Sequence, residues 1–352
     1  PDSGPGSNGK FVESSTGDER SGCAEWVSVL RERDPRKPFF LWLAAVDPHR
    51  PYEDKISSQP HRPDDVILPP YHPDTELVRR DYARYYDEIS RLDRFVGLVL
   101  DELEAQNAVE DTVVIFLSDN GRPFPRDKTS LYDSGIRTPL IIRWPAKIKA
   151  ASRCLQLVST IDLATTILAL AGFPAGSSYM GKDITSLLEG KDAQVRDVIF
   201  AEKNWHDYED RSRAVRDRRF KYIMNHYADL PATPPADAAR SDTFREMQRL
   251  RAEGRLPAEQ STCFISPRPR EELYDLNTDP HELTNLADLP SHRDTLLRMR
   301  AEYRQWRITT GEKNPRLRTP DEFDRDTGKP TPARIRPRWS KQKMIEEGIL
   351  LP

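Results

Sequence analysis

The stretch that most constrains the fold of this chain runs from residue 112 to residue 143. It opens with an apolar, β-branched run, Thr112 to Leu117, which is typical of a buried parallel strand. Asp119, Asn120 and Gly121 follow this run, and the glycine allows a sharp turn. In open α/β sheets, ligands bind at the carboxyl ends of the strands. The stretch therefore predicts an α/β sheet with Asp119 and Asn120 at its ligand-binding edge.

The chemistry of Asp119 and Asn120 favours a hard metal ion. A carboxylate beside an amide carbonyl offers the oxygen ligands that suit Ca²⁺ or Mg²⁺ and that suit a soft metal poorly. A surface turn is the alternative, because Asp-Asn-Gly is also a good turn sequence. The three residues by themselves leave both interpretations open.

A second apolar run, Phe39 to Val46, is another candidate for a buried strand. It ends in the sequence Asp-Pro-His-Arg-Pro, which places His49 between two prolines. Proline restricts the backbone, so this position suits an imidazole that must be aimed, although a polar loop histidine is the alternative. A long helix is expected from Asp74 or Thr75 to about Gln106, where it would cover the sheet as a crossover connection.

Short strands and turns follow from Val198. We expect strands at 198–202 and 272–276, a hairpin of 213–216 with 220–223, and helices at 242–253 and 291–308. Asn204, Trp205 and His206 are expected in a loop, either as packed and solvated residues or as the wall of a pocket. The sequence after Gly311 is charged and rich in proline, which predicts either an extended wrap or disorder.

These patterns divide the chain into four parts. The predicted parts are an N-terminal segment at 1–36, an α/β core at 37–196, a smaller α+β subdomain with an antiparallel sheet and a helix at 197–310, and a tail at 311–352.

Composition excludes two classes of partner. With 37% hydrophobic and 32% charged residues, the chain has no run of about 20 apolar residues, so no membrane span is expected. The formal net charge of -3 gives no basic field for nucleic acid, so an anionic substrate must be held by local cations. The three cysteines are far apart and form no metal-binding pattern.

The string DNGRPFPRDKTSLYDSG, which begins at Asp119, resembles a motif of the sulfatases in the alkaline phosphatase superfamily. Their pattern is a strand, Asp-Asn-Gly, a loop with a basic residue, a Tyr-x-x-Gly turn and Arg-x-Pro before the next strand. The Pro-Phe-Pro of the loop and the Asp-Pro-His-Arg at 47–50 are similar to the sulfamidase-like branch. The region from Glu272 to Leu276 resembles the carboxy-terminal signature of the family.

The resemblance implies a fold and a reaction. The fold would be alkaline-phosphatase-like, with a mostly parallel sheet between helices, and the reaction would be hydrolysis of a sulfate ester or sulfamate on a sulfated carbohydrate. Catalysis would use a formylglycine nucleophile and one Ca²⁺ ion. Asp119 and Asn120 would supply part of the calcium cage. His49 and Lys128 would be catalytic, as a proton donor and as a cation beside the sulfate. The residues implied for substrate binding are Asp47, Arg50 and His206.

Part of the family pattern is expected to lie outside these residues. Formylglycine is made within Cys/Ser-x-Pro/Ala-x-Arg, and none of Cys23, Cys154 and Cys263 begins that motif. The strand that ends in paired aspartates and the Lys-x-His strand of the family are also missing. We therefore expect the chain to be the carboxy-terminal two-thirds of a sulfatase and to be inactive alone. The family also implies export.

Two rival functions stay open at this point. A phosphomonoester or phosphodiester hydrolase of the same superfamily would share the metal cage. A non-catalytic protein would bind sulfated glycan through Arg50, Lys128 and His206. The sequence leaves open which sugar is the substrate, whether an N-sulfate or an O-sulfate is cleaved, and the oligomeric state.

Overall fold

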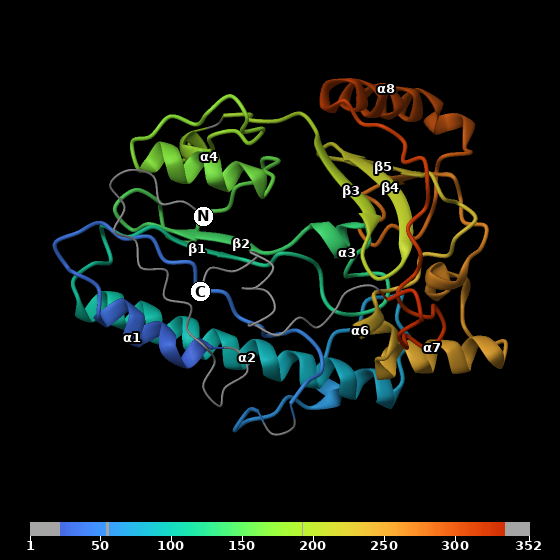
Figure 1. Ribbon diagram of the computed structural model, residues 1–352, viewed down its shortest axis with the longest axis horizontal. Helices are drawn as coiled ribbons and strands as arrows, with labels where there is room; N and C mark the ends of the chain where they lie inside the picture. The colour runs from blue at the N-terminus through green and yellow to red at the C-terminus, as the bar shows by residue number, and fades with distance from the viewer. Residues whose placement is uncertain (1–21, 54–55, 192, 335–352) are drawn as a thin grey trace. The chain divides into compact units, whose positions relative to one another are not determined.

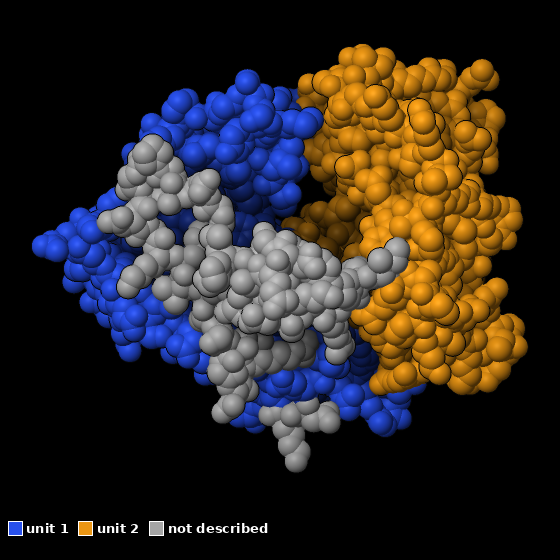
Figure 2. All heavy atoms as spheres, in the orientation of Figure 1, with its two compact units in different colours: residues 1–68, 74–118, 139–196 blue, residues 69–73, 119–138, 197–352 orange. Residues whose placement is uncertain are grey.

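The computed structural model describes residues 22–53, 56–191 and 193–334, and the chain divides into two compact units (Figure 2). Unit 1 comprises residues 1–68, 74–118 and 139–196, and unit 2 comprises residues 69–73, 119–138 and 197–352. The loop that follows the first strand, 119–138, thus groups with the C-terminal half of the chain. Of the predicted N-terminal segment, residues 1–21 lie outside the described part.

Unit 1 is built around one long helix. Its helices are η1 (Cys23–Glu25), α1 (Trp26–Arg31), η2 (Pro63–Asp65), α2 (Glu76–Ala105), α4 (Ile161–Leu170) and α5 (Thr185–Leu188). Helix α2 begins after Thr75, whose Oγ1 accepts a hydrogen bond from the Val78 amide, as expected for an N-cap. Phe95 of this helix packs with Cys23 and Trp26 in a buried apolar cluster. The long helix is therefore confirmed, and its apolar stripe forms the core of the unit.

The sheet of unit 1 differs from the expectation. Strand β1 (Val114–Leu117) pairs with β2 (Leu140–Arg143), and the two strands run between α4 and α2 in Figure 1. The pairing is antiparallel, with Leu117 opposite Leu140, so the parallel partner expected for Thr112–Leu117 is not found among the described residues. The apolar run specified a strand correctly, but strand direction depends on the neighbour, and that neighbour lies 23 positions further along the chain.

The prediction of a second strand at 39–46 is wrong. Residues 39–46 belong to neither sheet. Leu43 and Ala45 pack against the cluster around Phe95, whereas Trp42 on the other side of the segment is 77% exposed. The expectation failed because a continuous apolar run was taken to mean burial on both faces. In the described part of the chain, only one face of this segment is covered.

Unit 2 holds the antiparallel sheet and the C-terminal helix that were expected. Its strands, in the order β3-β4-β5-β6, are β3 (Ile199–Trp205), β4 (Glu209–Arg216), β5 (Phe220–Asn225) and β6 (Glu271–Asp275), and every pair is antiparallel. Helix α8 (Arg293–Thr310) packs Met299 against Val215 and Tyr222 of one sheet face. The opposite face packs Ala214 and Ile223 against the loop that follows Asn120, through Leu131 and Tyr132.

Several short elements complete unit 2. They are α3 (Asp133–Ile136), α6 (Ala236–Ala239), α7 (Asp242–Ala252), η3 (Ala258–Gln260), η4 (Thr262–Phe264) and η5 (Pro290–His292). The tail begins after α8, and its described part folds back along the unit. Phe323 is buried against Tyr208 and Ala236, and the Glu322 amide donates a hydrogen bond to the Asp207 carbonyl at 3.0 Å. Up to residue 334 the tail is therefore an extended wrap, and residues 335–352 lie outside the described part.

In the ranges that the structure describes, no helix is both long and apolar enough to cross a lipid bilayer.

Candidate functional site

The loop from Asp119 to Gly135 is closed on itself at Gly121. The Gly121 amide donates to the Gly135 carbonyl at 3.0 Å, and a side chain at this position would meet the Ser134 carbonyl oxygen at 2.0 Å. Only glycine allows the two ends of the loop to come this close. Asp119 and Asn120 are thereby held at the base of a folded loop that also carries Lys128.

The interior of this loop is packed and hydrogen-bonded. Phe124 is fully buried, and the Lys128 amide donates to the Arg122 carbonyl at 2.9 Å. Asp127 is also buried; its carboxylate accepts a hydrogen bond from the Tyr71 hydroxyl at 2.8 Å and forms an ion pair with Arg122, whose Nε lies 3.0 Å from Oδ2. These contacts lie within unit 2 and fix the backbone on both sides of Lys128.

Lys128 lies in a confined position. Its side chain is 10% exposed, and its Nζ lies 2.9 Å from Oδ2 of Asp237, at the start of α6. A lysine with these surroundings is a fixed cation. An anion that approached Lys128 would have to share it with Asp237.

Asp119 and Asn120 fit calcium by donor type and do not complete a calcium site. Asp119 is exposed and Asn120 is half-buried, so their oxygens are accessible. Ca²⁺ takes six to eight oxygen ligands. In the described ranges, no group of three or more His, Cys, Asp or Glu residues is arranged to hold a metal ion. The pair would supply part of a cage, as the family pattern implies.

His49 lies in unit 1, in an exposed loop after residue 46. Its Nδ1 is 2.5 Å from the Arg50 carbonyl oxygen. A carbonyl only accepts hydrogen bonds, so Nδ1 carries a proton and donates it. In the neutral ring, Nε2 then has no proton. His49 can therefore donate a proton from Nε2 only as the imidazolium ion.

Asp47 and Arg50 hold the His49 loop onto α2. The buried carboxylate of Asp47 receives two hydrogen bonds from Arg91, through Nε at 2.7 Å and Nη2 at 2.5 Å. Arg50 makes a two-pronged ion pair with Asp81 at 2.7 and 2.8 Å. Two-pronged pairs of this kind fix orientation as well as charge. The structure thus shows a positioning contact for both residues, and their predicted contact with substrate stays a prediction.

Glu88 is a titratable residue near this loop that sequence reasoning missed. It is fully buried in α2, and one carboxylate oxygen accepts from the Glu53 amide at 2.8 Å. Burial raises the pKa of Glu88 to about 7, and the neighbouring Asp47 charge adds to the shift. Its burial could not be predicted from its position in the sequence, because an acidic residue on a helix is normally exposed to solvent.

His206 lies in the turn between β3 and β4. Its ring is 42% exposed, and its Nδ1 lies 3.0 Å from Oδ2 of Asp207. The residues before it were expected in a loop, but Asn204 and Trp205 belong to β3, where the ladder is irregular between Lys203 and Trp205. The half-buried Trp205 therefore extends the strand, and a substrate role for His206 stays a prediction.

The predicted site residues fall into two groups. Asp47, His49 and Arg50 share one loop of unit 1, whereas Asp119, Asn120, Lys128 and His206 belong to unit 2. The convergence of both groups on one site stays a prediction.

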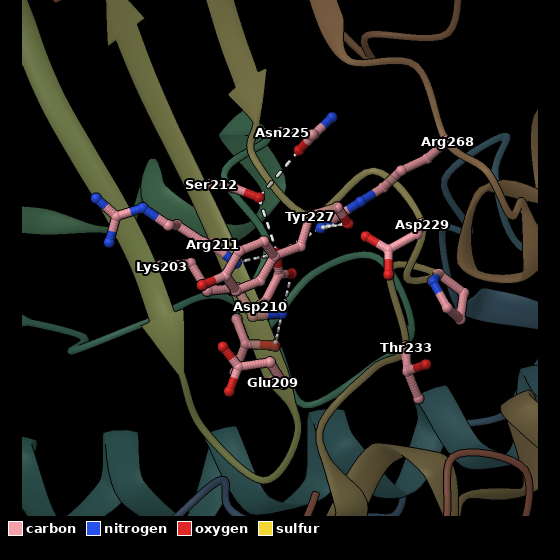
Figure 3. A network of polar contacts seen from close by, with 12 residues as sticks. Lys203, Glu209, Asp210, Arg211, Ser212, Asn225, Tyr227, Asp229, Thr233 and Arg268 are labelled. Carbon is pink, nitrogen blue, oxygen red and sulfur yellow. Dashed lines mark hydrogen bonds and ion pairs between the residues drawn. The ribbon is translucent and has the colours of Figure 1, made fainter. Parts of the chain in front are cut away.

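Unit 2 also contains a polar network that the sequence did not reveal (Figure 3). Asp210 lies at its centre, with Lys203 Nζ at 3.2 Å, Ser212 Oγ at 3.0 Å, and Arg268 in close contact. Burial acts to raise the pKa of Asp210, but the charges of Lys203 and Arg268 outweigh it and lower this pKa to about 2. Asn225, bonded to Ser212 at 2.9 Å, continues the network. Apart from Arg268, which precedes β6, these residues come from the three strands β3, β4 and β5, so only the pairing of the strands brings them together.

The prediction that the formylglycine pattern is missing needs a correction. Its serine form occurs twice, at Ser58–Arg62 and at Ser212–Arg216. Ser58 is exposed in a loop of unit 1. Ser212 lies within β4, where its hydroxyl is already bonded to Asp210 and Asn225. Sequence reasoning tested only the cysteines. Among the described contacts, neither serine hydroxyl is bonded to a group that would activate it as a nucleophile. The contacts of Ser212 with Asp210 in the same strand and with Asn225 in the neighbouring strand are structural.

Comparisons with known proteins agree with the resemblance. Residues 14–173 match the family model described as Sulfatase, and residues 124–237 match the model described as N-sulphoglucosamine sulphohydrolase, C-terminal. An ulvan-active sulfatase of Formosa agariphila is 40% identical over 70% of this chain and 41% of its own length. The human N-sulphoglucosamine sulphohydrolase is 32% identical over 80% of this chain and 62% of its own length.

A solved structure shows the fold. The protein yidJ of Bacteroides fragilis superposes with a TM-score of 0.61 over 82% of this chain and 58% of its own, at 19% sequence identity. The α/β fold class is thus confirmed. The chain spans 41% and 62% of the length of the two curated relatives.

Proposed function

This chain belongs to the sulfatase family, and we propose that its residues serve in an enzyme that removes sulfate from a sulfated glycan. The observation that carries the proposal is the loop closed at Gly121, which holds two oxygen ligands and a confined lysine in one rigid segment. Similarity to an N-sulphoglucosamine sulphohydrolase and to an ulvan-active sulfatase supports a sulfated sugar as substrate, with the sulfate on nitrogen or on oxygen.

Asp119 and Asn120 would hold a calcium ion together with ligands from outside this loop. The ion, when bound, neutralises negative charge on the sulfate oxygens. The family resemblance implies a formylglycine nucleophile. Export of the protein is likewise proposed from the family.

Lys128 would stabilise the sulfate group by its charge. Its amine is held near Asp237, so it is placed before any substrate arrives. Preorganised charge of this kind favours a transition state in which charge builds on the oxygens.

His49 would protonate the leaving oxygen or nitrogen of the sugar. Because Nδ1 is bonded to the Arg50 carbonyl, Nε2 is the nitrogen that would act in this step. Donation from Nε2 then requires the imidazolium ion. Asp47 and Arg50 would contribute by fixing the loop on α2.

The test replaces Lys128 in the full-length protein. We expect Lys128→Met to lower kcat/KM for sulfate release by about 100-fold or more, because a charge aimed at the reacting group is lost. Lys128→Arg keeps the charge and should retain much more activity. Lys147→Met, at an exposed lysine of unit 1, is the matched control and should match the wild type. Sulfate release is measured from an N-sulfated and an O-sulfated glucosamine.

Wild-type turnover by Lys128→Met would remove Lys128 from the site. Release of phosphate from a sugar phosphate, with no sulfate release, would favour the phosphohydrolase. Binding of sulfated sugar without any release would favour the non-catalytic alternative.

A further inference from the structure

Unit 2 encloses a cavity of about 460 Å³. One wall is the sheet face that carries Asp210 and Asn225, and the other walls are the loop 126–132 and the segments 258–265 and 282–285. The wall residues Glu259 and Thr284 are exposed, so the cavity has a rim at the surface of the unit. Most of its inner polar groups are bonded to one another, as Figure 3 shows for the network at Asp210.

Arg126 is the described cavity residue with two buried side-chain atoms that have no hydrogen-bond partner, whereas Ser130, Arg268 and Glu282 each have one such atom. Arg126 is only 5% exposed, and its guanidinium packs against two rings, 3.9 Å from the centre of Tyr132 and 4.6 Å from that of Tyr71. One nitrogen, Nη2, donates to the Glu282 carbonyl at 2.6 Å. Nε and Nη1 are buried and have no hydrogen-bond acceptor among the described residues.

In the described ranges, the charge of Arg126 has no carboxylate in close contact, although Glu282 interacts with it at longer range. Lys128 pairs with Asp237 at 2.9 Å, and Lys203 and Arg268 share Asp210. For Arg126 no carboxylate lies within 4.0 Å in the described part of the chain. A buried cation is costly unless it is paired, and a buried N–H without an acceptor adds to the cost. A group in the cavity beside Arg126 could supply both oxygens and negative charge once the guanidinium turns toward it, because Nε and Nη1 are themselves buried.

We propose that this cavity binds an oxyanion, a sulfate group, at Arg126. Nε and Nη1 donate to its oxygens, and its charge compensates the guanidinium. Lys128 also lines this cavity, but its charge is paired with Asp237. Binding at Arg126 goes beyond the proposed hydrolysis, because it needs neither calcium nor a nucleophile. The sulfate group can come from free sulfate or from a second sulfate on a glycan.

The first experiment measures anion binding by thermal unfolding of the protein. At constant ionic strength, sulfate at a hundredfold excess over its Kd should raise the Tm of the wild type by about 4 °C, whereas chloride should not. Arg126→Met removes the charge at similar length and should abolish this shift. Arg251→Met is the matched control, because Arg251 stacks on Phe264 at 4.9 Å outside the cavity. It should keep the full shift.

Equal sulfate shifts in wild type and Arg126→Met would overturn the proposal. Lys128→Met should leave the shift in place, and loss of the shift in that variant with retention in Arg126→Met would place the anion at Lys128 instead. The Tm shift tests this proposal and sulfate release tests the proposed hydrolysis, so either can fail without the other. The same titration with N-sulfoglucosamine, glucosamine and inorganic sulfate identifies the source of the sulfate group.

The second experiment does not depend on a variant that folds. Crystals of the wild-type protein grown with selenate, which mimics sulfate, are examined for the anomalous signal of selenium. A selenium peak within hydrogen-bond distance of Arg126 supports the proposal. Water alone at Arg126, or a carboxylate of the chain itself, overturns it.

Discussion

Glu88 is a carboxyl group whose protonation depends on its surroundings. It lies fully buried beside the ion pair of Asp47 and Arg91, and burial raises its pKa from 4.5 to about 7. A carboxyl whose pKa is raised on folding stabilises the folded state most below the pKa of the unfolded chain. That contribution is lost as the pH rises through the pKa of the folded state, so the loss should occur between about pH 4.5 and pH 7 and slightly above.

Glu88→Gln tests this pH dependence. Glutamine is neutral at every pH and still offers an oxygen to the Glu53 amide, which now bonds Glu88 at 2.8 Å. We expect the variant to be more stable than the wild type at pH 8.5 by about 1–3 kcal/mol, with a smaller difference or none at pH 4.5. Urea unfolding at several pH values measures this. Glu76→Gln, at an exposed position of the same helix, is the control, and parallel pH profiles for all three proteins would contradict the assignment.

Asp119 is the residue on which the proposed calcium site depends most. Its carboxylate supplies charge as well as an oxygen, whereas Asn120 supplies only an oxygen. We expect Asp119→Ala to weaken calcium binding at least tenfold and to abolish sulfate release in the full-length protein, measured by calorimetry and by a sulfate assay. Asp111→Ala, at the exposed start of the same strand segment, should do neither. Normal calcium affinity in Asp119→Ala would exclude Asp119 as a ligand.

The loop between β1 and α3 depends on close backbone contact at its two ends. A Cβ at Gly121 would lie 2.0 Å from the Ser134 carbonyl oxygen and 2.8 Å from Gly135 Cα, so alanine would force the loop open. Gly97 in α2 is the contrasting case, because no atom lies within 4 Å of a Cβ built there.

We therefore expect opposite effects from the same substitution. Gly121→Ala should lower the Tm and the rate of sulfate release by the full-length protein, because the displaced loop carries Lys128. Gly97→Ala should stabilise the protein by about 0.5–1 kcal/mol, since alanine favours the helix more than glycine does. Differential scanning calorimetry compares the two. If the Gly121→Ala protein has the same Tm as the wild type, the loop does not depend on this contact.

Elements with strong local signals were predicted well. The apolar period and the Thr75 cap defined α2, and α7 (Asp242–Ala252) occupies nearly all of the predicted residues 242–253. The predicted hairpin forms with Arg216 opposite Lys221. Strand direction had no such local signal. The antiparallel pairing of β1 with β2 depends on residues distant in sequence, and that is why the parallel expectation was wrong there.

Across the whole molecule, contacts rather than sequence order define the units. Residues 119–138 are flanked on both sides by residues of unit 1 and still belong to unit 2, because Leu131 and Tyr132 pack on the sheet face of β4 to β6. The tail beyond α8 likewise joins unit 2 through Phe323. The predicted division at 37–196 and 197–310 stays a prediction about domains.

The local order of residues was enough to indicate the family, the fold class, the long helices and the candidates His49, Asp119, Asn120 and Lys128. These depend on motifs and on periods of a few residues, which are written directly in the chain. The ion pairs of Asp47, Arg50 and Lys128, the buried Glu88 and the cavity at Arg126 could not be predicted. Each joins residues between 31 and 156 positions apart, or depends on the loss of water around a charge, and only folding brings such groups together.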